Sequence, residues 1–322
     1  MIKTITGLSL GSILLALGLP AQAQQPTKIA RVGYLSPGDS VSRSYRIEAF
    51  RQALKELGYI EGKNIIIEYR FGGATQERLP ELARDLLRLK VDVIFAGGAA
   101  TRAAKSVTQT IPIVTSSQDP VGSGLVEALP RPGGNITGLA NLTSELVGKR
   151  LELLKEVIPQ LSHVAVLWGN PDSITRRRTQ VAAQSLRLQL QIVEIQKRDE
   201  LESAFAAIKR ERAEALFMIR GPMINDLAKR IANLAAESRL PSIYDEERFP
   251  QLGGLMSYGT DLAEVDRRAA SYIDKILKGA KPADLPIERP TKFELVINLK
   301  TAKTLELKIP THLLMESAAV IE

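Results

Sequence analysis

The stretch VDVIFAGGAATRAAK, residues 91–105, contains an apolar run, a pair of glycines and an alanine-rich segment, in that order. The apolar run predicts a strand, and the alanines after it predict a helix. A strand that enters a helix through a glycine turn is a building unit of α/β proteins, and the first N–H groups of such a helix form a seat for an anion. The stretch therefore predicts an α/β fold and raises the question of which anion it binds.

Short β-branched runs alternate with helical patterns along most of the chain. The helical patterns place apolar residues three or four positions apart, as at Val147, Leu151, Leu154 and Ile158. Such alternation predicts right-handed strand-helix-strand units and parallel sheets. The strands that we expect are residues 30–35, 64–69, 91–96, 113–116, 163–168, 191–196, 215–219, 241–244 and 255–258.

The order of strand, glycine loop, helix, proline and strand occurs twice, in residues 91–117 and again in residues 214–247, which predicts two similar lobes. The stretch RPGGNITGLAN, residues 131–141, has the glycine and proline content of a connector between them. Later come a helix at 262–277, a proline-rich stretch and the strand-like FELVINL, which we expect to cross back and complete both lobes. The expected lobes are residues 28–139 with 261–291, and residues 142–258 with 296–322.

Residues 1–23 are expected to be a secretory signal peptide. Lys3 supplies the positive head, residues 5–19 the apolar stretch, and residues 21–23 (AQA) the cleavage site. The apolar stretch is shorter than the roughly 20 residues that a membrane-spanning helix needs, and Pro20 ends it. No later segment is apolar for long enough to span a bilayer, so we expect the mature chain in the periplasm.

Composition excludes several classes of function. The chain has 322 residues and no cysteine, which rules out disulfides, thiolate nucleophiles, zinc thiolate sites and lipid attachment through an N-terminal cysteine. The formal charge is +7, but basic residues are scattered among acidic ones, so we expect no nucleic-acid partner. The run Arg176-Arg177-Arg178 is interpreted as the solvated first turn of a helix, with a phosphate-binding patch as the alternative.

In parallel α/β sheets, ligands bind beyond the carboxyl ends of the strands. The loops expected there are rich in glycine, hydroxyl and amide groups, which offer neutral donors at helix N-termini where the macrodipole favours an anion. One carboxylate fits the small seat at Gly97-Gly98 better than a pyrophosphate does, and a turn that binds nothing is the alternative. The loops are SPGDSVS (36–42), RFGGAT (70–75), GGAAT (97–101), TSSQDPVGSG (115–124), GNPDS (169–173), RGPM (220–223), YDEERF (244–249) and YGTD (258–261).

The loops do not carry the motifs of common enzymes. GGAAT fits neither GxGxxG nor GxxxxGK[ST], and Lys105 falls too far into its helix to serve as a phosphate lysine. There is no GxSxG motif, and the two histidines, His163 and His312, lie away from these loops. No paired His or Asp/Glu ligands stand at close spacing. We therefore expect no catalysis, no cofactor and no metal.

What remains is a site that holds a small molecule without transforming it. Asp119 is the acidic residue most readily placed in a cleft, with a turn before Pro120 as the alternative role. Four aromatic residues lie at or beside strand ends, where they could stack on a ligand or fill the core: Phe71, Trp168, Tyr244 and Tyr258.

The sequence resembles the ABC-transporter substrate-binding proteins that include tryptophan and other aromatic amino-acid binders. The segments that carry the resemblance cover nearly the whole mature chain: RVGYLSPG, EAFRQALKELGYIEGKNIIIEYRFGG, LARDLLRLKVDVIFAGG, IPIV with DPVGSGLVEALPRPGGNITG, KRLELLKEVIP, LPSIYDEERFPQLGGLMSYG and DKILKGAKPADLPIERPTKFELVINLKTAKTLELKIP. The resemblance implies the type I periplasmic-binding-protein fold, with two Rossmann-like lobes, parallel sheets and a hinge of three segments. It also implies a ligand enclosed between the lobes, an inner-membrane ABC permease as partner, and no catalysis.

By position, the resemblance implies that two sets of loops supply the two halves of the site: SPGDSVS, GGAAT and SQDP in the first lobe, and GNPDS, RGPM and YDEERF in the second. Relatives usually carry Asp-Pro after the third strand of lobe 2, whereas this chain reads Arg220-Gly221-Pro222, so an aromatic amino-acid specificity does not transfer directly. The candidate ligand-binding residues are Ser36, Ser40, Gly97, Gly98, Thr101, Ser117, Asp119, Asn170, Arg220, Tyr244 and Tyr258.

The sequence thus predicts a monomeric periplasmic solute-binding protein of an ABC importer, with an amino acid or a related small carboxylate as ligand. One alternative is a sensory module that presents its closed form to a receptor. A second is an α/β enzyme, which would need a general base that these loops do not supply.

Overall fold

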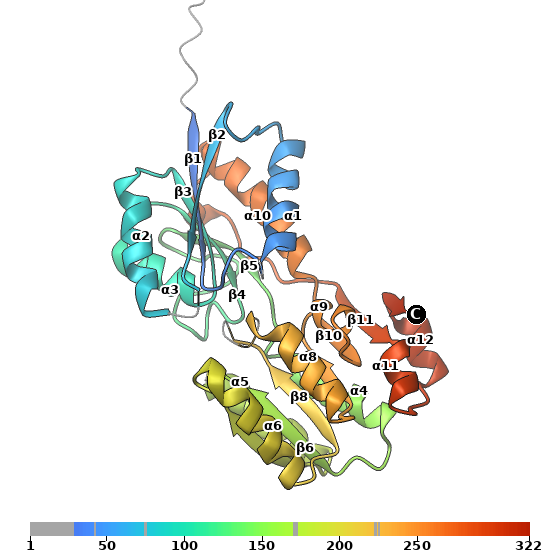
Figure 1. Cartoon of the computed structure of the whole chain (residues 1–322). Helices are drawn as coiled ribbons and strands as arrows, with labels where there is room; N and C mark the ends of the chain where they lie inside the picture. The colour runs from blue at the N-terminus through green and yellow to red at the C-terminus, as the bar shows by residue number, and fades with distance from the viewer. Residues whose placement is uncertain (1–28, 42, 74–75, 170–172, 222–223, 225) are drawn as a thin grey trace, which may run out of the picture.

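The computed structural model describes residues 29–41, 43–73, 76–169, 173–221, 224 and 226–322 (Figure 1). Two α/β lobes lie one above the other, and each is built on its own sheet. The predicted α/β class with mostly parallel strands is confirmed. The expected signal peptide, residues 1–23, lies outside the described residues.

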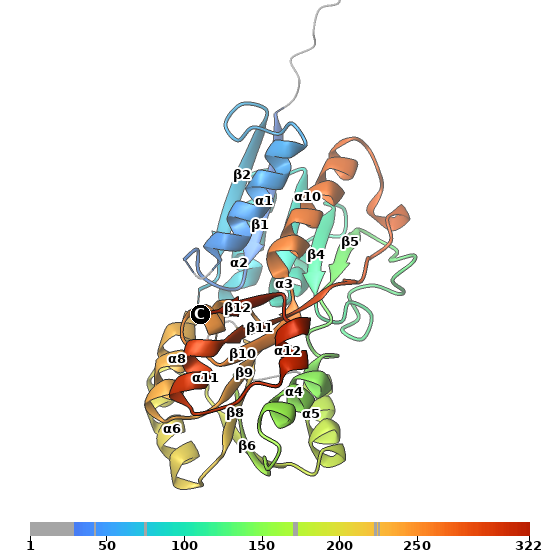
Figure 2. The ribbon, with the colours of Figure 1, turned by 90° about the vertical axis from the view of Figure 1, so that its right-hand side faces the viewer.

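The first lobe, at the top of Figure 1, has five parallel strands in the order β2-β1-β3-β4-β5. Helices α1 and α10 cover one face of the sheet, and α2 and α3 cover the other. Figure 2 shows α1 and α10 side by side, although about 200 residues separate them in the sequence. The elements are β1 (Ala30–Ser36), α1 (Ser44–Glu56), β2 (Ile65–Phe71), η1 (Gln76–Arg78), α2 (Leu79–Arg88), β3 (Val93–Gly97), α3 (Ala99–Val107), β4 (Ile113–Ser117), β5 (Ile136–Ala140), α10 (Leu262–Leu277) and η3 (Pro282–Asp284).

The second lobe repeats this pattern and extends it. Its strand order is β12-β11-β10-β9-β8-β6-β7, and all neighbours are parallel except β10 and β11. One face packs against α4, α11 and α12, and the other against α6, α8 and α9. The elements are α4 (Val147–Val157), β6 (His163–Trp168), α5 (Ser173–Ser185), β7 (Gln189–Glu194), η2 (Arg198–Glu200), α6 (Leu201–Arg210), β8 (Ala215–Ile219), α8 (Ala228–Glu237), β9 (Ser242–Tyr244), α9 (Arg248–Gln251), β10 (Met256–Thr260), β11 (Phe293–Asn298), α11 (Leu299–Thr304), α12 (Thr311–Glu316) and β12 (Ala319–Ile321).

Helix α10 shows how the sequence pattern produces these layers. Its apolar residues recur every three or four positions, and Val265, Ala269 and Ile273 are buried against the first sheet. Asp261 begins the helix, because its side chain accepts a hydrogen bond from the Glu264 N–H at 3.0 Å. The helix therefore starts and ends at the residues predicted from the sequence, 262 and 277.

The chain passes between the lobes three times. It leaves β5 for α4 and β6, returns from β10 to α10, and crosses again before β11. Before the last crossing, Glu288 forms a bridge with Leu139 at the edge of the first sheet. These three segments form the hinge that the resemblance implies.

Most predicted elements are present. Each of the nine strands expected in the two lobes is found with its ends within two residues of the prediction. The interpretation of residues 131–141 as a connector alone was wrong, since residues 136–140 form β5 and pair with β4. Strand β12 at residues 319–321 was also missed; it pairs with β11 at the sheet edge.

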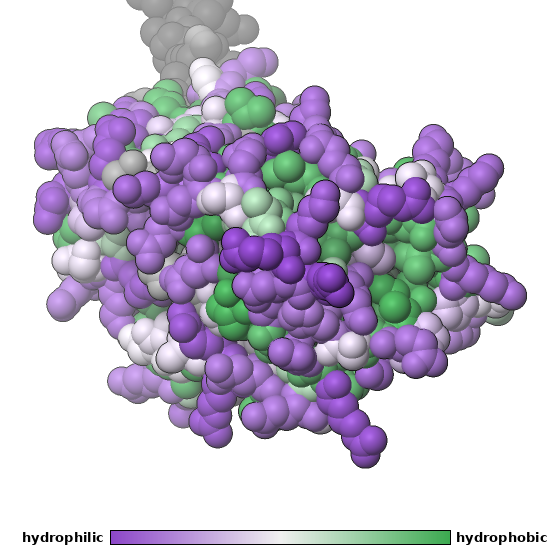
Figure 3. All heavy atoms as spheres, turned by 60° about the horizontal axis from the view of Figure 1, so that its bottom comes forward, coloured by the Kyte–Doolittle hydropathy of each residue, from purple (hydrophilic) through white to green (hydrophobic). Residues whose placement is uncertain are grey.

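Figure 3 shows the face at the bottom of Figure 1, where hydrophilic side chains cover most of the surface and hydrophobic ones form separate patches. The large apolar side chains gather instead in four buried clusters, one on each face of the two sheets. Within the described part of the chain, no helix has the length and apolar character required to cross a bilayer.

Candidate ligand-binding site

A cavity of about 520 Å³ lies between the carboxyl ends of the two sheets. The first lobe contributes Ser36 at the end of β1 and Ser117 at the end of β4. The second lobe contributes Gly169 after β6 and Arg220 after β8. This volume lies within the usual range for small-molecule sites, and the position is the one where α/β sheets bind ligands.

Six of the eleven candidate residues line this cavity. Asn170 lies outside the described residues, and the remaining four are placed elsewhere. The six are Ser36, Gly97, Gly98, Ser117, Asp119 and Arg220.

Two hydroxyl residues in the candidate set do not reach the cavity. Thr101 is fully buried below it, where its Oγ1 lies 2.9 Å from the Ala96 carbonyl oxygen and 2.8 Å from Thr115 Oγ1. With its hydroxyl committed to the protein, Thr101 supports the turn rather than the ligand. Ser40 is exposed on the loop after β1 and is not among the described residues that line the cavity.

The two candidate tyrosines also point away from the cavity. Tyr244 is 0% exposed and stacks on Phe249 at 4.4 Å between ring centroids, within the core of lobe 2. Tyr258 packs against the opposite core of the same lobe and lies 6.3 Å from the ring of Phe293. Trp168 is likewise a core residue, with 1% exposure. The structure therefore contradicts stacking of a ligand on these rings.

The glycine turn between β3 and α3, at residues 97–98, has the predicted form. Gly98 has φ 54° and ψ −120°, a conformation that favours glycine, and α3 begins at Ala99 directly after it. Both residues line the cavity, so the N-terminus of α3 faces it. The N-terminal residues Ser173 and Ile174 of α5 line it from the second lobe. Two helix dipoles thus favour negative charge in the cavity.

Asp119 combines both of the roles considered for it. It lines the cavity, and its Oδ1 accepts a hydrogen bond from the Gly122 N–H at 2.8 Å. Its backbone oxygen accepts further bonds from the Ser123 N–H and hydroxyl. Asp119 therefore stabilises the turn after β4 while its carboxylate stays at the cavity wall.

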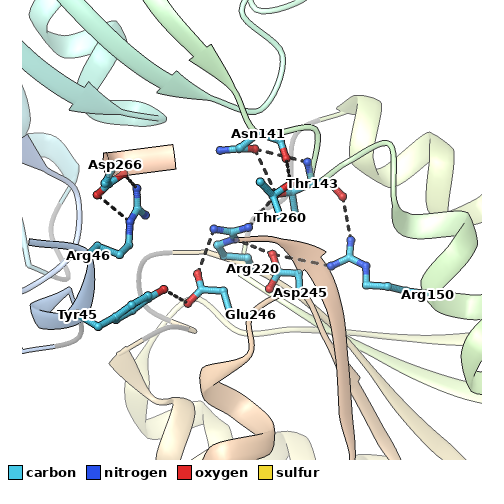
Figure 4. A network of polar contacts seen from close by, with 10 residues as sticks. All are labelled: Tyr45, Arg46, Asn141, Thr143, Arg150, Arg220, Asp245, Glu246, Thr260 and Asp266. Carbon is cyan, nitrogen blue, oxygen red and sulfur yellow. Dashed lines mark hydrogen bonds and ion pairs between the residues drawn. The ribbon is translucent and has the colours of Figure 1, made fainter. Parts of the chain in front are cut away.

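A buried ion-pair network forms the second-lobe wall (Figure 4). The guanidinium of Arg220 donates to Asp245 Oδ2 at 2.6 Å, to Glu246 Oε1 at 3.0 Å and to Thr143 Oγ1 at 2.8 Å. Burial by itself would lower the pKa of Arg220, but the two carboxylates raise it above its usual value. The charge of Arg220 is thus balanced by the protein. Tyr45 joins this network from the first lobe, with its hydroxyl 3.3 Å from Glu246 Oε2.

A second buried pair lies on the first-lobe side of Figure 4. Arg46 in α1 donates through Nε and Nη2 to the carboxylate of Asp266 in α10, at 3.0 and 2.5 Å. The Tyr34 hydroxyl donates to the same carboxylate at 3.2 Å. Burial by itself would lower the pKa of Arg46, and Asp266 more than reverses that effect.

Three further arginines line the cavity: the exposed Arg102 and the buried Arg43 and Arg150. Arg150 in α4 is 1% exposed, donates to the Thr143 carbonyl oxygen at 3.0 Å and lies 3.8 Å from Asp245 Oδ2. Burial lowers its pKa to about 10. Arg43, just before α1, is 7% exposed and also lines the cavity.

Sequence reasoning missed these arginines because it considered only loops at strand ends. Arg43 follows the SPGDSVS loop by one residue, and Arg150 and Arg46 are on helices. A usable signal was present, since Arg150 stands three residues after Val147 and four before Leu154, on the buried face of α4. A charged residue on an apolar helix face requires a partner in the fold.

The cavity offers mainly cationic, hydroxyl and amide groups. No cluster of three or more His, Cys, Asp or Glu side chains that could hold a metal ion occurs among the residues described. His163 lies at the start of β6, and the exposed His312 pairs with Glu156 at 2.9 Å between Nε2 and Oε2. Both histidines are therefore remote from the cavity, which is suited to holding a small anion.

Two Rossmann-like lobes, a three-segment hinge and a cavity with helix N-termini in its walls define the type I periplasmic-binding-protein fold. The chain belongs to the family of ABC transporter substrate binding proteins, whose model matches residues 35–321. Family and fold are thus those of solute-binding proteins rather than enzymes.

Several relatives agree with this assignment. The chain is 26% identical over 270 residues to a tyrosine-binding protein of Clostridioides difficile, covering 81% of this chain and 76% of the relative. It is similar to a conserved domain protein from Vibrio cholerae, with a TM-score of 0.84 and 26% identity over 91% of this chain and 100% of the other. It also shares its fold with an ABC domain from Streptococcus pneumonia in complex with L-Trp, with a TM-score of 0.82 and 23% identity over 91% of this chain and 99% of the other.

Proposed function

We propose that this chain is a periplasmic solute-binding protein of an ABC importer, which captures an amino acid or a related small carboxylate and delivers it to an inner-membrane permease. The observation that carries the proposal is the cavity of about 520 Å³, whose walls come from both lobes and meet at two helix N-termini. The names of the relatives, which refer to tyrosine and L-Trp, support a ligand of this class.

We propose in addition that the protein does not transform its ligand. Asp119 is the acidic residue among the described residues that line the cavity, and one of its oxygens is engaged by the Gly122 N–H. The histidines lie elsewhere, so the described walls offer no evident general base. We also propose that the protein is a monomer and that residues 1–23 are the signal peptide that directs its export. The proposed lobes are residues 28–139 with 261–291 and residues 142–258 with 296–322.

A thermal-shift screen over amino acids, small organic acids, purines and sugars tests ligand capture. A ligand present at 100 times its dissociation constant stabilises a protein by about 2.7 kcal/mol, which is readily detected. The same ligand is expected to contract the protein in solution X-ray scattering as the lobes close on it. A screen without a stabilising compound, or an unchanged radius with saturating ligand, would contradict the proposal.

Delivery to a permease is tested in cells. Deletion of the gene is expected to abolish uptake of the identified ligand at concentrations near the dissociation constant. If uptake is unchanged and a ligand-dependent transcriptional or motility response is lost, the chain serves sensing instead.

A further inference from the structure

Arg43 is a buried cation in the cavity wall that no carboxylate of the described residues neutralises directly. It is 7% exposed, and its Nε has no hydrogen-bond partner. Burial lowers the pKa of Arg43, and the guanidiniums of Arg46 and Arg220 lower it further, while Glu246 alone opposes them among the carboxylates. A guanidinium in such surroundings is costly unless an anion joins it.

Two further residues in the wall carry unsatisfied donors. Ser116 at the end of β4 is 3% exposed, and its hydroxyl has no hydrogen-bond partner. The Nε and Nη1 atoms of Arg150 are buried without a hydrogen bond as well. All three residues line the same cavity, so its unused polar groups are donors from both lobes. Buried donors of this kind are normally satisfied by an acceptor, and a ligand held in the cavity can supply one.

The buried carboxylates beside the cavity mostly have partners within the protein. Asp245 Oδ2 and Glu246 Oε1 accept hydrogen bonds from Arg220, and Asp266 accepts two from Arg46. Asp245 Oδ1 has no hydrogen-bond partner, but Asp245 is not among the described residues that line the cavity. A ligand ammonium would have to compete for these carboxylates with guanidiniums that already donate hydrogen bonds to them. The wall also has an apolar part, with Tyr34 and Phe95 in the first lobe and Ile174 and Ile219 in the second.

Resting on the proposed function, we propose that the ligand is an organic acid with an apolar body and no ammonium group, and that Arg43 receives its carboxylate. Arg150 and Ser116 supply donors for the same or a second oxygen-bearing group. The carboxylate thereby accepts from Arg43 Nε, which has no hydrogen-bond partner within the protein, and a ligand ammonium would be repelled by the surrounding arginines.

Pairs of compounds that differ only in the ammonium group test this inference by isothermal titration calorimetry. The pairs are L-tyrosine and phloretate, L-tryptophan and indolepropionate, L-phenylalanine and hydrocinnamate, L-leucine and isocaproate, and L-aspartate and succinate. We expect at least one acid to bind about tenfold or more tightly than its amino acid. Tighter binding of the amino acid in every pair that binds would overturn the inference.

Two arginine variants separate Arg43 from the general charge of the first lobe. Arg43→Gln is expected to weaken binding of the acid about thirtyfold or more. Arg84→Gln is the control, because Arg84 is exposed on α2 and is not among the described residues that line the cavity, and its removal is expected to change affinity less than threefold. Equal effects of the two substitutions, or wild-type affinity in Arg43→Gln, would refute the role of Arg43. Circular dichroism and the melting temperature without ligand confirm that each variant is folded.

Asp119→Asn distinguishes failure of this inference from failure of the proposed function. If an amino acid binds, contracts the protein and is lost in Asp119→Asn, the solute-binding function holds and the ligand class inferred here is wrong. If an acid binds and Asp119→Asn leaves its affinity equal or higher, the inference is supported. If no compound of the pairs or of the wider screen binds, both are rejected.

Discussion

Replacing Asp245 by asparagine is expected to be the most damaging single change to the empty protein. Its side chain is 0% exposed, accepts from Arg220 Nε at 2.6 Å and lies 3.8 Å from Arg150 Nη1. Asparagine keeps the shape but removes the negative charge, which leaves two buried guanidiniums with one carboxylate, Glu246, nearby. Breaking a buried pair in this way typically costs about 3 to 5 kcal/mol.

Urea unfolding followed by circular dichroism measures this loss, and an unchanged m value would show that the native state stays compact. A loss of this size corresponds to a fall in melting temperature of roughly 6 to 20 °C for a lobe-sized unit. Asp284→Asn, at an exposed position, serves as the matched control and is expected to stay within about 0.5 kcal/mol of wild type.

Adding Arg220→Met to Asp245→Asn tests the cause of the loss. The double variant is expected to be less destabilised than the sum of the two single variants, since each substitution removes the partner that the other leaves uncompensated. Strict additivity, or a loss below about 1 kcal/mol for Asp245→Asn alone, would refute the account of this network as a buried ion pair.

Three further predictions concern neighbouring residues. Arg43→Met is expected to raise the unfolding free energy of the unliganded protein by about 1 to 3 kcal/mol in urea titrations. The reason is that burial of this cation and its repulsion by Arg46 outweigh its attraction to Glu246. Arg220 and Arg43 hold the pKa of Glu246 below its usual 4.5 despite burial. The ionised Glu246 therefore stabilises the folded protein above pH 4.5, and this contribution is lost as the pH falls. In thermal melts below pH 4.5, Glu246→Gln should lose stability less steeply than the wild type. Thr101→Val is expected to cost about 1 to 3 kcal/mol in stability and to leave ligand affinity unchanged by calorimetry, and the reverse pattern would restore Thr101 as a ligand contact.

The fold was predictable because the spacing of apolar residues and the positions of glycine and proline agree along this sequence. Buried parallel strands appear as short apolar runs, and helices such as α10 appear as apolar residues three and four positions apart. Strand β5 was missed for a physical reason: ITGLA follows two glycines and contains a third, Gly138 at φ 131°, so its local propensity is weak. Its pairing with β4 and the bridge to Glu288 hold it in place, and both are tertiary contacts that no local pattern contains.

The candidate site was predictable only in part. The rule that ligands bind beyond strand ends correctly placed Ser36, Gly97 and Arg220 at the cavity wall. The same rule failed for Tyr244 and Tyr258, because a residue at a strand end can point to either face of the sheet and these two point into the cores. Side-chain direction depends on the exact register and on the packing of neighbouring helices, neither of which the sequence states.

The same buried charges connect the cavity with the hinge. Arg220 and Arg150 both contact Thr143, in the first segment that joins the lobes, and the Thr260 hydroxyl ties the second segment to the Asn141 carbonyl oxygen at 2.6 Å. An anion that enters beside Arg43 therefore acts on a network that already holds two of the three crossing segments. On the proposal made above, the buried Arg43 guanidinium lowers the stability of the unliganded protein, and a bound carboxylate is expected to offset that cost. Affinity and unliganded stability are accordingly expected to change in opposite directions at Arg43, whereas at Asp245 a loss of stability should bring no gain in affinity.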